Sequence, residues 1–148
     1  MRRNVREGLV FFASLIAAII NGYIFNYINE IFYHYTSNDN GLSEFNKFTK
    51  FLIIIFIAPL VETWVFNQLP NLALKKINIS SEFILIVLPS ILFSLFHLYH
   101  PIYAIMAFVG GLIINFYYIH CQRKKMVAFL MVALLHASYN LYGFLFVA

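Results

Sequence analysis

The feature that most constrains this chain is a series of long apolar runs. Five are visible, at approximately residues 8–33, 48–74, 82–99, 101–120 and 126–147. Each is near the ~20 residues that a helix needs to cross a bilayer. A membrane interior offers no water to backbone polar groups, which favours helices over open strands. We therefore predict an all-α, polytopic membrane helix bundle with about five transmembrane helices.

The composition agrees with this prediction. Of the 148 residues, 62% are hydrophobic and 11% are charged, whereas roughly a quarter of the residues in a soluble domain are charged. This length is expected to form a single transmembrane domain over residues 1–148. The basic, apolar N-terminal segment also resembles a signal peptide, but no A-x-A site leads into a polar mature domain. We interpret it as a retained first span.

The positive charges predict the orientation. The net charge of +4 lies in short segments between the apolar runs, which indicates membrane topology rather than a nucleic-acid partner. Eight basic residues fall on one side: Arg2, Arg3, Arg6, Lys75, Lys76, Arg123, Lys124 and Lys125. Lys47 and Lys50 fall on the other, after a polar loop with an Asn40-Gly41 turn signal. The N-terminus is therefore predicted to be cytoplasmic.

Two kinds of residue predict local features of the spans. Pro59 is expected to kink the second span just before Glu62, and Pro70 to end its regular helix early, so that residues 71–79 follow the cytoplasmic interface. In the fourth span, Ala107 and Gly111 form a small-xxx-small pair. This pattern lets two helices approach closely, and we interpret it as packing.

Four polar residues stand inside the apolar runs: Glu62, His97, His136 and Asn140. An ionisable group in hydrocarbon costs at least about 2.5 kcal/mol. Counted from the predicted cytoplasmic ends, all four lie at a similar depth, roughly 16–23 Å in. His136 and Asn140 share one helical face because they are four residues apart. The sequence therefore predicts a Glu–His–His–Asn cluster buried in the bilayer.

Such a cluster suits peptide hydrolysis by an activated water. Glu62 with His97 would deprotonate water, since a carboxylate held away from water is a good proton acceptor. His136 and Asn140 would donate hydrogen bonds to an oxyanion, a contribution worth a factor of about 10²–10³ per donor. No serine or cysteine nucleophile is needed.

Other roles for the same residues stay open. Glu62, His97 and His136 would also suit a catalytic zinc ion, although H-E-x-x-H is absent. Alternatively, the polar residues would only tie helices together, for about 0.6–2 kcal/mol each. The remaining histidines lie near span ends and are expected to be interfacial: His34, His100 and His120.

The pattern resembles the CAAX-protease and bacteriocin-processing family of intramembrane proteins, also called the Abi family. Its first motif is a glutamate pair, usually preceded by Ala-Pro, with an arginine five positions after the first glutamate. Here Ala58–Glu62 supplies the approach and the first glutamate. The second motif, F-x-x-x-H, is intact at residues 93–97, and the third, H-x-x-x-N, at residues 136–140. The resemblance covers roughly residues 48–145.

The resemblance implies that Glu62 and His97 activate water, and that His136 and Asn140 hold the oxyanion. This chain departs from the family pattern at two positions, with Thr63 for the second glutamate and Asn67 for the arginine. The exchange removes one charge of each sign. It is therefore interpreted as the coupled loss of a supporting ion pair.

Our leading hypothesis is an intramembrane endopeptidase of this type in a bacterial cell membrane. Its partners would be membrane lipids and a hydrophobic or lipidated peptide substrate. The alternative is a non-catalytic membrane protein that gives bacteriocin self-immunity, or scaffolds a partner, by binding. A proton-coupled transporter also fits buried Glu and His residues, but no inverted repeat is present.

Overall fold

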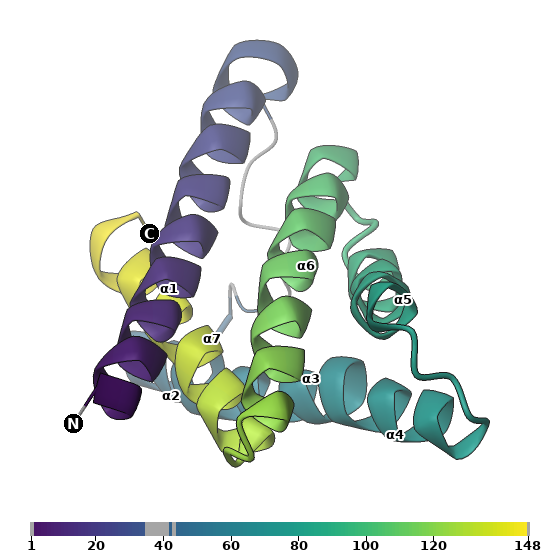
Figure 1. The fold of residues 1–148 in the computed structure, drawn as a ribbon. Coiled ribbons are helices and arrows are strands. Elements are labelled where there is room, and N and C mark those ends of the chain that lie inside the picture. Colours follow the sequence, from purple (N-terminus) through teal and green to yellow (C-terminus); the bar gives the residue numbers. More distant parts are fainter. Residues whose placement is uncertain (1, 35–41, 43, 148) are drawn as a thin grey trace.

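Every regular element in the computed structural model is a helix, over the residues that it describes, 2–34, 42 and 44–147 (Figure 1). The predicted Asn40-Gly41 turn lies outside the described residues. The elements are α1 (Arg2–Ile28), η1 (Asn29–Tyr33), α2 (Lys47–Leu52), η3 (Ile53–Ile57), α3 (Ala58–Thr63), η4 (Trp64–Gln68), α4 (Leu69–Lys76), α5 (Glu82–Leu95), α6 (Pro101–Arg123) and α7 (Ala128–Phe146), where η marks a π-helical turn.

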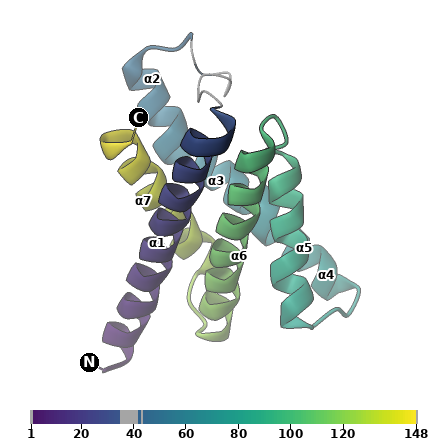
Figure 2. The ribbon, with the colours of Figure 1, turned by 90° about the horizontal axis from the view of Figure 1, so that it is seen from above.

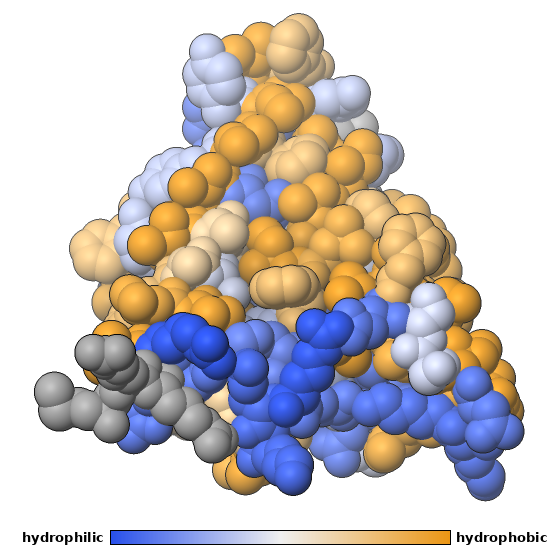
Figure 3. All heavy atoms as spheres, in the orientation of Figure 1, coloured by the Kyte–Doolittle hydropathy of each residue, from blue (hydrophilic) through white to orange (hydrophobic). Residues whose placement is uncertain are grey.

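Within the part of the chain that the structure describes, four helical segments are long and apolar enough to cross a membrane: Asn4–Tyr33, Lys47–Lys76, Pro101–Arg123 and Ala128–Phe146. Large hydrophobic side chains are exposed along all four. Figure 3 shows hydrophobic atoms over most of the visible face and hydrophilic atoms along its lower edge. The chain is a polytopic helical bundle of an integral membrane protein, as predicted.

The predicted span at 82–99 is shorter than expected. Its helix, α5, has 14 residues and ends at Leu95, which gives it a length of about 21 Å against a hydrocarbon core of about 30 Å. The following turn is set by Pro101, which disfavours helical geometry in the residue before it. His100 is accordingly extended, with φ −135° and ψ 119°.

The second span runs through both prolines. The predicted early end at Pro70 is wrong, because the helix continues to Lys76. A π turn precedes each proline, η3 before Pro59 and η4 before Pro70. A proline lacks an N–H and its ring crowds the preceding turn, and the wider π turn accommodates both effects within a continuous helix. The irregularity expected before Glu62 therefore takes the form of η3.

Helix α6 packs between α5 and α1, and it runs beside each of them in both views (Figures 1 and 2). The approach to α5 is close, since a Cβ placed on Gly111 would lie 3.1 Å from the Cα of Ser90. This confirms the small-residue pair as a packing feature. On the other side, Asn21 of α1 donates from Nδ2 to the carbonyl oxygen of Met106, at 3.0 Å.

The ends that carry the predicted cytoplasmic charges meet in space. Lys75 donates from Nζ to Oε1 of Gln122, at 2.5 Å, and Arg123 forms an ion pair with Glu82. The end of α4, the start of α5 and the end of α6 therefore lie together. That these segments are cytoplasmic stays a prediction.

Candidate active site

Glu62 and His136 come together from two different spans. Glu62 lies on α3 and His136 on α7, and the distance from Glu62 Oε2 to His136 Nε2 is 3.5 Å. His136 is buried, with 6% of its surface exposed, and Glu62 is partly buried. A carboxylate and an imidazole at this distance interact electrostatically, and strongly so where water is excluded.

His97 follows the end of α5 and is oriented by its own backbone. Its Nδ1 lies 2.8 Å from the carbonyl oxygen of Phe93. A carbonyl oxygen only accepts hydrogen bonds, so Nδ1 carries the hydrogen and Nε2 is left as an acceptor. The ring of Phe93 packs on His97 at a centroid distance of 4.5 Å, and on His136 at 6.2 Å. One aromatic side chain thus spaces the two imidazoles.

Asn140 ties α7 to the π turn before Pro59. Its Nδ2 donates to the carbonyl oxygen of Ile54, at 2.9 Å. In this turn the N–H of Ala58 reaches back five residues to Ile53, so the corresponding partner of Ile54 would be Pro59, which has no N–H. A carbonyl freed by a proline in a membrane helix needs another donor. The Asn140 carboxamide supplies it.

The two positions that depart from the family pattern differ in their surroundings. Thr63 is fully buried, and its hydroxyl makes no hydrogen bond to any residue that the structure describes. Asn67 donates from Nδ2 to Oδ1 of Asn115, at 2.8 Å. Asn115 donates in turn to Oγ of Ser90, at 3.2 Å, and to the carbonyl oxygen of Gly111, at 3.0 Å.

This neutral network was missed by the sequence reasoning. Asn115 and Ser90 are both fully buried, yet each is a polar residue within an apolar run, as the four candidate residues are. The presence of these polar residues in apolar runs could therefore have marked them as candidates. Their positions in the sequence did not indicate which helices face one another. At Asn67, where the resemblance leads us to expect an arginine, this chain has an amide paired with an amide.

A small cavity joins the network to the Glu62–His136 pair. Its volume is about 10 Å³, and its polar walls are Glu62, His136, Asn67 and Asn115. A volume of about 10–15 Å³ with two to four polar partners is enough for one water molecule. The site therefore combines a carboxylate, an imidazole and a space of the size of a single water.

The zinc alternative is not supported by the side-chain positions. Among the residues that the structure describes, no three His, Cys, Asp or Glu side chains gather in a group that can hold a metal ion.

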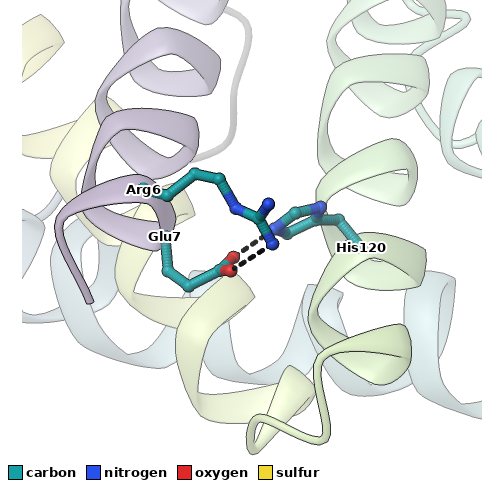
Figure 4. A network of polar contacts seen from close by, with 3 residues as sticks. All are labelled: Arg6, Glu7 and His120. Atoms are coloured by element: carbon teal, nitrogen blue, oxygen red, sulfur yellow. Dashed lines mark hydrogen bonds and ion pairs between the residues drawn. The ribbon is translucent and has the colours of Figure 1, made fainter. Parts of the chain in front are cut away.

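His120, which is expected to be interfacial, pairs with a carboxylate that the sequence pattern did not indicate. Its Nε2 lies 2.5 Å from Oε2 of Glu7, on α1, and both side chains are largely buried. Figure 4 shows the Glu7 carboxylate directed at His120, with the Arg6 guanidinium beside it. This pair links α1 to α6 far from Glu62 along the chain, and we give it a structural role.

A family model described as type II CAAX prenyl endopeptidase Rce1-like matches residues 44–142. The matched region contains all four candidate catalytic residues and leaves α1 outside. No curated protein and no solved structure matches the chain. The match indicates an intramembrane protease of the CAAX type.

Proposed function

We propose that this chain, which belongs to the Rce1-like family of type II CAAX prenyl endopeptidases, hydrolyses a membrane-associated peptide with Glu62 as general base. The observation that carries the proposal is the contact between Glu62 and His136 at 3.5 Å, beside a cavity of about 10 Å³. Buried ionisable groups inside membrane spans are costly, so their meeting favours a functional site.

In the proposed reaction, a water molecule occupies the small cavity and donates a proton to the Glu62 carboxylate. The water oxygen bonds to the carbon of the scissile carbonyl, and the electron pair of the C=O bond moves onto the carbonyl oxygen. The tetrahedral intermediate then collapses, the C–N bond breaks, and the leaving amine takes the proton from Glu62. General-base catalysis of this kind contributes a factor of about 10²–10⁴.

The other three residues would act around this step. Nε2 of His97 is an acceptor, so His97 would assist Glu62 by accepting a proton from the water molecule. His136 and Asn140 would donate to the oxyanion. Asn140 already uses one N–H on the Ile54 carbonyl, and its second N–H is the one assigned to the intermediate. The Asn67–Asn115 pair would hold the cavity wall that an ion pair is expected to support in the family.

The proposed substrate is a hydrophobic or lipidated peptide in a bacterial cell membrane. A catalytic group within membrane spans meets peptides that partition into the bilayer, and water reaches it through a restricted volume. Self-immunity to a bacteriocin by binding alone is the competing function. If the chain acts by binding alone, Glu62→Gln should leave the protection unchanged.

The test compares membrane and secreted peptides from cells that express wild type, Glu62→Gln or the matched control Glu44→Gln, at equal protein levels. Glu44 is exposed and lies outside the site. We expect at least one peptide product to disappear with Glu62→Gln and to persist with Glu44→Gln. Retained cleavage in Glu62→Gln would overturn the mechanism, and an unchanged immunity phenotype there would favour the binding protein.

A further inference from the structure

A large cavity lies outside the catalytic cluster, between α1, α6 and α7. Its volume is about 590 Å³, which is within the range of about 300–1,000 Å³ found for ligand pockets. Residues from the second half of α1, the start of α6 and the end of α7 line it. One wall is therefore supplied by α1, which the family model does not match.

Two tyrosines connect this cavity to the catalytic cluster. Tyr103 lines the cavity, and its ring centroid is 5.3 Å from that of His97. Tyr139 also lines it and lies on α7 between His136 and Asn140. A peptide whose scissile bond sits at the catalytic cluster would therefore have the cavity beside it.

The cavity has an apolar part and an acidic part. Most of its lining is apolar or aromatic, including Tyr23 and Tyr142, whose hydroxyls are 2.8 Å apart. At the α1 end the lining includes Glu30, which accepts from Nδ2 of Asn26 at 3.1 Å. Within the described part of the chain, no basic side chain forms an ion pair with Glu30. Its negative charge is available to a ligand.

We propose that this cavity, given the proposed function, binds the part of the substrate peptide next to the scissile bond. An apolar side chain would enter the tyrosine-lined part, and a basic side chain would pair with Glu30. Charge complementarity selects this occupant, because a purely apolar lipid chain would leave the Glu30 carboxylate unused. The first span, α1 with η1, would then determine specificity for a catalytic cluster that lies outside it.

The test measures binding to catalytically inactive Glu62→Gln protein in lipid nanodiscs, with empty nanodiscs as reference. The probes are two fluorescein-labelled leucine–alanine peptides that differ at one position, lysine or norleucine. We expect the lysine probe to bind about three- to five-fold more tightly, as for an ion pair with an exposed carboxylate, and the preference to shrink at high salt. Adding Glu30→Gln should abolish the preference, whereas adding Glu44→Gln should leave it.

A second pair of variants tests the apolar part. A Cβ on Gly143, which lines the cavity, meets nothing within 4 Å, and the same is true of Gly8, which lies on another surface hollow. Gly143→Leu would place a side chain inside the cavity and should weaken binding of both probes by about ten-fold or more. Gly8→Leu is the matched control and should bind as the parent does.

The outcomes separate this inference from the proposed function, because binding needs no turnover. Equal binding of both probes by the parent, or an unchanged preference after Glu30→Gln, would overturn the acidic subsite. Unchanged binding after Gly143→Leu would overturn the apolar one. If these binding effects are absent but cleavage in cells still depends on Glu62, the proposed function holds and the proposed role of this cavity is wrong.

Discussion

The close packing of α5 on α6 predicts different effects on stability for the same exchange at two adjacent glycines. A Cβ on Gly111 would lie 3.1 Å from both Cα and Cβ of Ser90, whereas a Cβ on Gly110 would meet only Nδ2 of Asn21, at 3.6 Å. Carbon atoms pack at about 3.5–4.0 Å. Gly110→Ala therefore adds an ordinary contact, and Gly111→Ala forces two helices apart by about 0.4 Å.

The magnitudes follow from these distances. Both exchanges gain the same helix propensity, worth up to about 1 kcal/mol, so this term cancels when the two variants are compared. Overpacking costs about 1–3 kcal/mol. Ser90 cannot move away easily, because its hydroxyl donates to the Ile86 carbonyl oxygen at 2.6 Å and accepts from Asn115. We expect Gly111→Ala to be less stable than Gly110→Ala by about 1–3 kcal/mol.

The assay is reversible unfolding of both variants and wild type in the same mixed micelles. Gly110→Ala should match or exceed wild type, and Gly111→Ala should fall below Gly110→Ala. Gly111→Ala should also reduce cleavage, because Asn115 borders the small cavity at Glu62 and donates to the Gly111 carbonyl oxygen. Equal stability of the two alanine variants would refute the close contact between α5 and α6.

Two further predictions concern polar contacts between helices. In a double-mutant cycle, Asn67→Ala and Asn115→Ala should couple by about 0.6–1.7 kcal/mol, as membrane hydrogen bonds do; additive effects would contradict the 2.8 Å contact. Glu7→Gln should lower the unfolding temperature and speed hydrogen exchange in α1, because His120 then faces a neutral amide in place of a carboxylate. Arg6→Gln should do so less, since Arg6 is exposed and 3.6 Å from Glu7; equal effects would argue against a specific Glu7–His120 link.

Much of the site follows from residue order alone. Glu62 and His136 stand out because a polar group in an apolar run is costly, and counting residues at about 1.5 Å each puts them at one depth. The structure brings these two together at 3.5 Å. The catalytic roles of these two residues, and of His97 and Asn140, stay predictions until cleavage is measured.

Spacing did not indicate which polar groups would be partners. The pairing of Asn67 with Asn115, and of Glu7 with His120, joins residues 48 and 113 positions apart. In a membrane helix, the face in contact with lipid and the face in contact with other helices both carry apolar side chains. The hydrophobic pattern therefore does not indicate which face is buried. The partner of each polar residue is therefore decided by how the helices pack.

The sequence by itself determined that this chain is a helical membrane protein, because apolar length acts locally along the chain. It also predicted, from the cost of buried charge, four candidate catalytic residues at one depth. The tertiary structure decided the rest. It directed Asn140 of α7 to the carbonyl oxygen that Pro59 leaves without a donor, and it paired Asn67 with Asn115 of α6. Each of these outcomes depends on a second helix supplying a contact, and no single segment encodes that contact.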